Sequence, residues 1–234
     1  MNDHTDGVPT FGFLHTSPVH VATFEALVAE IAPGATAVSV VDESLLERAR
    51  ADGPDAPLVE DGIERALDAL ERSRADVVVC TCSTIGGTAE RIGGERGVDV
   101  TRVDRPMVER ALATGQRIGV VAAVESTIAP TLSLIDSIAG DLGRRPHVTV
   151  HLLPGAWALF EDGDIDGYLD AIARELPQIA DTCDVVVLAQ ASMAAVTDRV
   201  EVSVAVLSSP RLAIEAAVAA ADSAVSSSRR DRRV

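Results

Sequence analysis

Lysine is absent from this sequence of 234 residues, so all 20 basic side chains are arginine. A chain without lysine cannot form a Schiff base with pyridoxal phosphate or a carbonyl substrate, and it has no lysine for a phosphate-binding P-loop. Cysteine is also scarce, with three residues. Their spacing forms no disulfide framework, which fits a reducing compartment.

Basic residues are few compared with acidic ones, 20 against 36, and the formal net charge is −16. This charge disfavours nucleic acid and anionic membranes as partners. No apolar run is long enough to span a bilayer, and residues 1–10 are polar and acidic, unlike a signal peptide. We therefore expect a cytoplasmic protein that binds neither nucleic acid nor membrane.

Short β-branched runs alternate with helical segments along the chain, which predicts an α/β fold with parallel sheets. Strands are expected at 10–14, 37–41, 76–82, 98–103, 117–123, 147–152, 184–190 and 202–207. Helices are expected at 19–31, 45–51, 58–74, 107–114, 130–139, 165–180 and 211–225, with a further helix after Cys82 that Gly93-Gly94 interrupts.

The two halves of the chain repeat each other. Asp76-Val77-Val78-Val79 recurs 108 residues later as Asp184-Val185-Val186-Val187, and Gly12 recurs 107 residues later as Gly119. This repeat predicts two pseudo-symmetric parallel-sheet lobes with the active site in the cleft between them. We expect the first lobe at 1–105, completed by 202–225, the second lobe at 106–201, and a disordered tail at 226–234.

Cys82 is the central candidate for chemistry. Its strand delivers Cys82, Ser83 and Thr84 to the carboxyl end of a parallel sheet, where ligands of α/β folds bind. A helix beginning there directs free N–H groups and its positive dipole end at the thiol, which favours the thiolate. Cys80 and Cys183 are expected to be structural, and Cys80 with Cys82 lacks the further ligands of a metal site.

The 108-residue offset assigns a partner to each of these residues. It places Gln190 opposite Cys82 across the cleft and Ser192 at the position of Thr84. His15 and Thr16 end the first strand, so they are expected to line the same cleft. His15 is a candidate acid or base, and Thr16 and Ser192 are candidate substrate-binding residues.

Three segments resemble the aspartate/glutamate/hydantoin racemase superfamily. Thr81-Cys82-Ser83-Thr84 is similar to the family's Ala-Cys-Asn-Thr, residues 118–127 are similar to its second-lobe strand with Thr-x-x-x-Thr, and Leu207-Ser208-Ser209-Pro210 fits the end of the domain. The resemblance covers residues 11–216. It implies a cofactor-independent enzyme, and it suggests a homo-oligomer that no residue specifies.

In this family two cysteines, one per lobe, transfer protons on opposite faces of a carbon next to a carboxylate or carbonyl. The resemblance implies that Cys82 is the first-lobe acid or base. It also implies that Ser83, Thr84 and Thr127, with Ser126 beside it, bind the carboxylate of a small-molecule substrate. Such substrates have very weakly acidic α-protons, so hydroxyl and N–H groups must stabilise the developing charge.

The second family cysteine is replaced here by Gln190, and Ala123 stands where threonine is common. Because glutamine does not titrate, it cannot transfer a proton. Three enzymatic alternatives remain. Cys82 could protonate an enolate after decarboxylation, as the single cysteine of arylmalonate decarboxylases does from the second-lobe position. It could instead add to a double bond, as in maleate isomerases, with Gln190 as a catalytic hydrogen-bonding electrophile. In the third alternative, His15 is the second acid or base. A carboxylate-binding protein without turnover is the non-enzymatic alternative.

Overall fold

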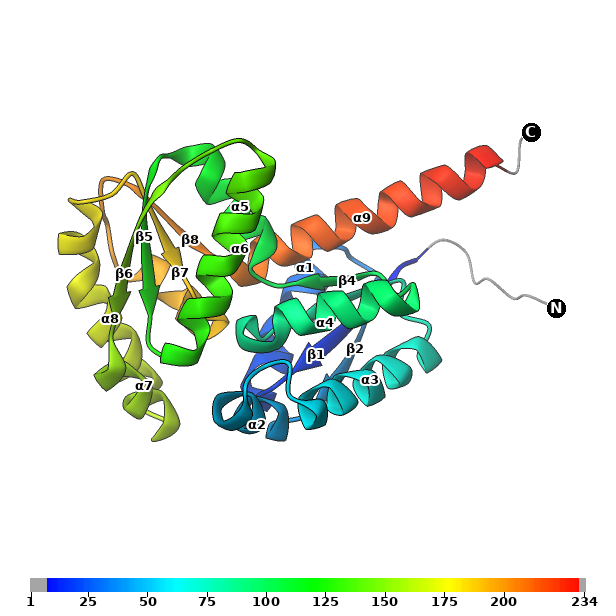
Figure 1. Cartoon of the computed structure of the whole chain (residues 1–234). Coiled ribbons are helices and arrows are strands. Elements are labelled where there is room, and N and C mark those ends of the chain that lie inside the picture. Colours follow the sequence, from blue (N-terminus) through cyan, green and yellow to red (C-terminus); the bar gives the residue numbers. More distant parts are fainter. Residues whose placement is uncertain (1–7, 232–234) are drawn as a thin grey trace. The chain divides into compact units, whose positions relative to one another are not determined.

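The computed structural model describes residues 8–231 and divides into two compact units. The described part of unit 1 comprises residues 8–102 and 211–231, and unit 2 comprises residues 103–210. Each unit contains one four-stranded parallel sheet flanked by helices (Figure 1). The predicted α/β class and the division into two similar lobes are therefore confirmed.

The sheet of unit 1 has the strand order β2-β1-β3-β4. Its strands are β1 (Thr10–His15), β2 (Thr36–Val41), β3 (Val77–Cys80) and β4 (Val100–Arg102). The helices around it are η1 (Pro18–His20), α1 (Val21–Ile31), α2 (Ser44–Asp52), α3 (Pro57–Arg72) and α4 (Ser83–Arg96), together with α9 (Ser209–Asp231), which belongs to unit 1 from residue 211.

The sheet of unit 2 repeats this order as β6-β5-β7-β8. Its strands are β5 (Arg117–Ala122), β6 (His147–Leu152), β7 (Val185–Leu188) and β8 (Ala205–Ser208). The helices are α5 (Arg105–Thr114), η2 (Glu125–Thr127), α6 (Ile128–Asp141), α7 (Pro154–Glu161), α8 (Ile165–Ala180) and η3 (Ala191–Asp198). The repeat seen in the sequence is thus a repeat of topology.

The apolar residues of β3 are buried on both faces of its sheet, as expected for a central parallel strand. On one face, Val78 and Cys80 join a buried cluster with residues of α2, α3 and α4. On the other face, Phe13 of β1 packs against Phe24 of α1, with ring centroids 5.4 Å apart. These two layers fix β3 and the beginning of α4.

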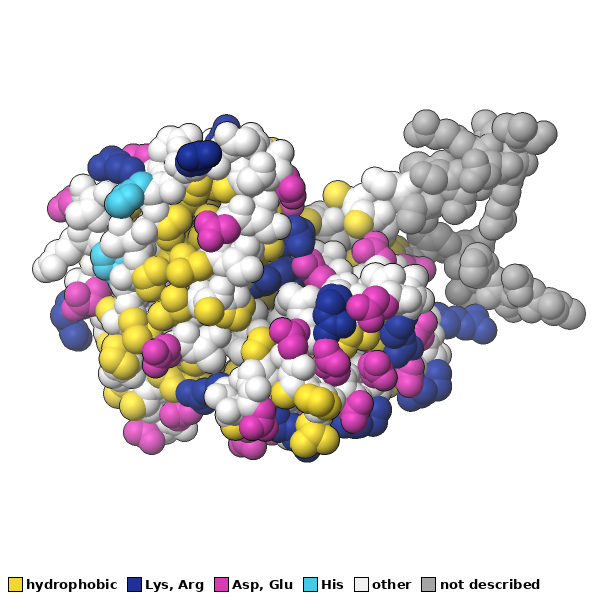
Figure 2. All heavy atoms as spheres, in the orientation of Figure 1, with side chains coloured by type: hydrophobic (Ala, Val, Ile, Leu, Met, Phe, Trp, Pro, Cys, Tyr) yellow, Lys and Arg dark blue, Asp and Glu magenta, His cyan; other side chains and the backbone are white. Residues whose placement is uncertain are grey.

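Exposed ion pairs also join α4 to α3. Arg91 pairs with Glu60, and Arg96 pairs with Asp68 and with Glu71, the last at 2.6 Å. Figure 2 shows charged side chains of both signs over this part of unit 1. Since exposed pairs each contribute little, packing of the buried helix face is the main support of α4.

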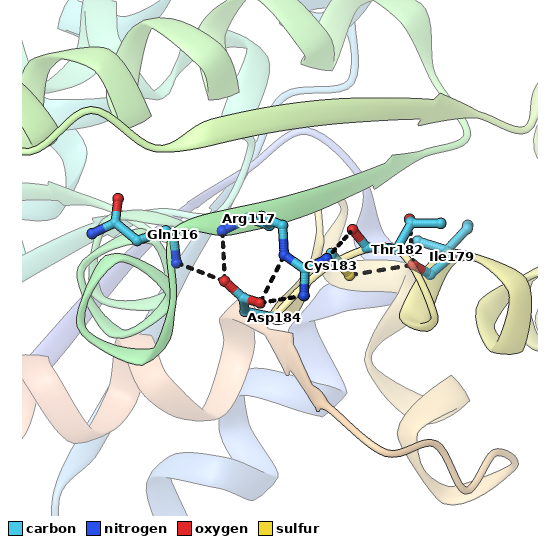
Figure 3. Close-up of polar contacts among 6 residues, drawn as sticks. All are labelled: Gln116, Arg117, Ile179, Thr182, Cys183 and Asp184. Atoms are coloured by element: carbon cyan, nitrogen blue, oxygen red, sulfur yellow. Dashed lines mark hydrogen bonds and ion pairs between the residues drawn. The ribbon is translucent and has the colours of Figure 1, made fainter.

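The repeated aspartate, which directly precedes β3 or β7, accepts hydrogen bonds from the start of the neighbouring strand, β1 or β5. In unit 1, the Asp76 carboxylate accepts a hydrogen bond from the Thr10 N–H at 2.8 Å. In unit 2, Asp184 accepts from the N–H groups of Gln116 and Arg117 and from the Arg117 guanidinium at 2.7 and 2.9 Å (Figure 3). These bonds hold the pKa of Asp184 at about 2, with the backbone bond from Arg117 the largest cause.

The repeated glycine allows the first strand to approach the residue just before that aspartate. A Cβ at Gly12 would lie 2.8 Å from the Ala75 Cβ, and one at Gly119 would lie 3.2 Å from the Cys183 Sγ. Cys183 therefore has the place in unit 2 that Ala75 has in unit 1. It is 5% exposed, and its thiol donates to the Ile179 carbonyl at 3.3 Å.

Replacing Asp184 with asparagine is expected to lower the melting temperature at pH 7, because the amide cannot accept from both the backbone and the guanidinium as the carboxylate does. A folded-state pKa below the ordinary 3.8 stabilises the fold above pH 3.8, and this contribution is lost as the pH falls toward 2. The difference in melting temperature between wild type and Asp184→Asn should therefore shrink as the pH falls from 3.8 toward 2, as measured by thermal scans. Asp222→Asn, an exposed change on α9, is the control. Equal melting temperatures at pH 7 would contradict this role for Asp184.

Three details of the fold differ from the sequence expectations. The strand expected within 202–207 is β8, which pairs with β7 of the second sheet and so does not complete the first lobe. Helix α4 continues through Gly93-Gly94, because Gly93 lies closely against Val100 of β4, and it ends at Gly97 with φ 72°. The tail expected to be disordered is helical as far as Asp231, since extending an existing helix costs less than starting one. Residues 232–234 lie outside the described residues.

No helix within residues 8–231 combines the length and the apolar character needed to cross a membrane.

Candidate active site

Cys82 lies between β3 and α4, at the N-cap of the helix. Its backbone is extended, with φ −108° and ψ 111°, which turns the chain from the strand into the helix. The thiol is free and the residue is half-buried, whereas Cys80 is fully buried and donates its S–H to the Cys82 carbonyl at 3.7 Å. The first turn of α4 carries no acidic residue, so the positive end of its dipole is not neutralised there.

Ser83 and Thr84 begin α4, and both are at least 94% buried. Their position directly after Cys82 brings two hydroxyls to the end of the helix where its first N–H groups have no partner within the helix. Unit 1 therefore joins a thiol, hydroxyls and helix N–H groups at one place, a combination suited to an anionic ligand.

Arg102 lies beside the candidate site, and its position was not predicted from the sequence. It ends β4, is 4% exposed, and its Nη2 donates to the Ser83 carbonyl at 3.4 Å. A Cβ at Gly86 would lie 2.9 Å from the Arg102 Cβ, and one at Gly87 would lie 3.5 Å from its Nη1. Two consecutive glycines within a helix are costly, so Gly86-Gly87 was the available signal for a side chain lying against α4.

Gln190 occupies the corresponding position in unit 2, at the N-cap of η3, with φ −119° and ψ 140°. Its Oε1 accepts from the Ala123 N–H at 2.8 Å, and its Nε2 donates to the Thr127 Oγ1 at 2.5 Å. The Thr127 hydroxyl in turn donates to the Val124 carbonyl at 2.8 Å. The structure thus joins Gln190 and Thr127 to each other, and the donor of the Thr127 hydroxyl is used within the unit.

Ser192 and Ser126 lie in the 3₁₀ helices of unit 2, and both are half-buried. The Ser192 hydroxyl contacts the phenol of Tyr168 at 2.9 Å. Tyr168 is fully buried, and burial raises the pKa of its phenol to about 12, so it stays neutral at physiological pH. Ser126 lies in η2 directly before Thr127.

His15 lies on the other face of the first sheet. Leu14 belongs to the cluster under α2, α3 and α4 that Cys82 also contacts, so strand alternation turns His15 toward α1. There it packs against Phe24, with ring centroids 5.6 Å apart. Thr16, which follows it, is 7% exposed.

Both ring nitrogens of His15 have partners within the fold. Nδ1 lies 2.8 Å from the Thr81 Oγ1, which itself donates to the Leu14 carbonyl, so we assign the Nδ1 proton as the donor. Nε2 then accepts from the Ser39 hydroxyl at 3.3 Å. Burial, with a smaller contribution from His20, lowers the pKa of His15 to about 4. His15 is therefore placed as a neutral, buried and hydrogen-bonded histidine.

No cluster of three or more His, Cys, Asp or Glu side chains that could hold a metal ion occurs in the part of the chain that the structure describes.

Comparisons with known proteins relate this architecture to one family. A family model described as Asp/Glu/Hydantoin racemase matches residues 16–217. A search of curated proteins found no match.

Solved structures with this fold include racemases and a decarboxylase. Glutamate racemase isoform RacE1 from Bacillus anthracis is 16% identical, with a TM-score of 0.66, over 90% of this chain and 80% of that one. Aspartate racemase from Picrophilus torridus is 13% identical, with a TM-score of 0.68, over 92% and 94% of the two chains. A mutant of arylmalonate decarboxylase in its sulfate-associated form is 15% identical, with a TM-score of 0.58, over 92% and 94%. At these identities the similarity establishes the fold, and with the family model it shows that the chain belongs to the Asp/Glu/Hydantoin racemase family.

Proposed function

We propose that this protein is a cofactor-independent, racemase-like isomerase that acts at a carbon next to a carboxylate, with Cys82 as the acid/base or nucleophile. One observation carries the proposal. Cys82, a half-buried residue with a free thiol, is the N-cap residue of α4 in unit 1, whereas the corresponding residue of unit 2, Gln190, is an amide already bonded to Ala123 and Thr127. Membership of the racemase family supports the reaction class.

In the proposed reaction the Cys82 thiolate takes the α-proton of a bound carboxylate substrate. The C–H electron pair moves into the carboxylate to give an enediolate. Return of a proton from the thiol to the same face gives exchange with solvent, and return to the opposite face, after the enediolate has turned over, gives the isomer. Ser83, Thr84 and the first N–H groups of α4 would stabilise the added negative charge. We further propose that Thr16, Ser126 and Ser192 contact the substrate, and that Thr127 holds Gln190 as a hydrogen-bonding group.

A single-cysteine decarboxylase is the second candidate, and the absence of a titratable group at position 190 favours it. With a malonate-type substrate, one C–C bond breaks, carbon dioxide leaves, and the electron pair remains in an enediolate. The Cys82 thiol then protonates this enediolate on one face. A second thiol is not needed for this reaction.

The test is a panel of carboxylates incubated with the protein in deuterated water. Both enantiomers of aspartate and glutamate, hydantoins, maleate and phenylmalonate are followed by proton NMR and chiral chromatography. Exchange or isomerisation of a substrate without carbon dioxide release is the expected result. Release of carbon dioxide from the malonate would favour the decarboxylase. Binding of carboxylates without any turnover would replace both proposals with a binding protein.

A further inference from the structure

The internal repeat makes His20 and Thr127 corresponding residues. His20 ends η1 and Thr127 ends η2, 107 positions later, and each is the N-cap of the helix that follows. Their backbone angles nearly coincide, with φ −82° and ψ −22° for His20 and φ −81° and ψ −23° for Thr127. Each N–H also donates to the residue three positions earlier, at 3.4 and 3.2 Å. The two residues therefore have the same place in their units.

Thr16 and Ala123 correspond in the same way. Thr16 follows the last residue of β1, and Ala123 follows the last residue of β5. The strands on either side are in equivalent register, because Leu14 pairs with Cys80 in one sheet and Val121 pairs with Leu188 in the other. The neighbouring positions 82 and 190 are both extended N-caps.

In unit 2 a side-chain carboxamide joins the three corresponding positions. Gln190 bridges the Ala123 N–H and the Thr127 hydroxyl. In unit 1 the same positions hold Cys82, Thr16 and His20, and the cysteine side chain ends at Sγ. Among residues 8–223, no side chain or backbone group accepts a hydrogen bond from the Thr16 N–H, and none bonds to the His20 ring.

We propose that the Thr16 N–H and the His20 imidazole form a carboxylate subsite beside Cys82, in which a ligand carboxylate takes the place that the Gln190 carboxamide has in unit 2. This inference rests on the proposed function. A carboxylate is planar and branched like a carboxamide, and its two oxygens can accept from both groups. The ligand carbon next to the carboxylate would then face the thiol.

The state of His20 suits this role. Burial lowers the pKa of His20 below the ordinary 6.5, so the ring is neutral at physiological pH and keeps one N–H donor. A neutral imidazole binds a carboxylate by hydrogen bonding and not by ionic attraction. The subsite should therefore select short carboxylates by shape and hydrogen bonding. The N-terminal end of α4 adds its positive dipole end to this selection.

Two alkylating reagents of equal size test the subsite without knowledge of the substrate. Iodoacetate carries a carboxylate and iodoacetamide a neutral amide. In each reaction the Cys82 sulfur forms a bond to the CH₂ carbon, the C–I bond breaks, iodide leaves with the electron pair, and the thiol proton goes to solvent. Rates at each cysteine are measured by peptide mass spectrometry, in about 0.2 M salt to screen the net negative charge of the protein.

We expect Cys82 of the native protein to prefer iodoacetate over iodoacetamide about 10-fold more strongly than the cysteines of the unfolded protein do. Propionate should compete with iodoacetate for the subsite. In His20→Phe the iodoacetate rate should fall about 10-fold, as for loss of one hydrogen bond to a charged group, while the iodoacetamide rate stays within about twofold. His20→Asn keeps an N–H donor and should retain part of the preference. His147→Phe, at an exposed histidine, is the control and should match wild type.

An unchanged iodoacetate preference in His20→Phe would overturn the subsite. Failure of the proposed function gives a different result, because Cys82 would then react with both reagents no faster than the buried Cys80 and Cys183. Equal loss of both rates in His20→Phe would show that His20 supports the local fold, and it would also overturn the subsite.

Discussion

Replacing Cys82 with serine is expected to lower the rate of α-proton exchange by about 10³-fold, within the range that positioned acid–base groups contribute. The serine hydroxyl keeps the size and place of the thiol but is a far weaker acid, so it supplies neither the base nor the proton donor at neutral pH. Proton NMR in deuterated water measures the rate, on whichever carboxylate of the panel the wild-type protein turns over. Circular dichroism establishes that the variant is folded.

Cys183→Ala is the matched control for this experiment. Cys183 is buried, its pKa is raised mainly by burial, and it packs against Gly119 as Ala75 packs against Gly12. Because alanine already fits the corresponding position of unit 1, Cys183→Ala should keep wild-type activity. A Cys82→Ser protein with more than a tenth of the wild-type rate would remove Cys82 from the chemistry, and so would an equal loss in Cys183→Ala.

The fold could be predicted from the sequence because its repeat follows from local physical needs. Asp76 and Asp184 recur because each accepts hydrogen bonds from the start of a first strand. Gly12 and Gly119 recur because each makes room for the residue just before that aspartate. Buried valines between them mark the central strands. These interactions involve residues close in sequence or in two neighbouring strands, so they produce a pattern that can be recognised in the sequence.

Two of the details that were wrong depend on contacts distant in sequence. Gly93 breaks no helix because its missing side chain is required by Val100 of β4. The pairing of β8 with β7 brings residues 185–188 beside residues 205–208, and no pattern in the latter segment specifies it. Local propensities reveal the glycine and the strand in the sequence, but they do not reveal the residues that pack against them.

For the candidate site, the sequence predicted the positions and not the contacts. The offset located Gln190 at the place of Cys82, and both residues are N-caps in the structure. The bonds of Gln190 to Ala123 and Thr127, and the position of Arg102 along α4, are visible only in three dimensions. Whether the proposed site residues act on a substrate stays a prediction.

His15 is expected to make the protein sensitive to mild acid. Its pKa falls from the ordinary 6.5 to about 4 in the folded state, so between these values the unfolded chain takes up a proton that the folded chain does not. The contribution of His15 to the free energy of unfolding is therefore complete above pH 6.5 and is lost as the pH falls toward 4. The loss is about 3 kcal/mol, at 1.36 kcal/mol for each pKa unit. Urea titrations at several pH values between 7 and 4 measure this decline. His20, whose pKa is also lowered, adds to it in the same direction.

His15→Gln separates this contribution from that of the other groups. The variant should be less stable at pH 7, because one of the two hydrogen bonds to Thr81 and Ser39 is lost. It should also lose less stability than wild type between pH 6.5 and 4, because it has no buried imidazole to protonate. His147→Gln, at an exposed position, should follow the wild-type curve. Parallel curves for wild type and His15→Gln would contradict the lowered pKa and leave carboxylate protonation as the cause of the acid sensitivity.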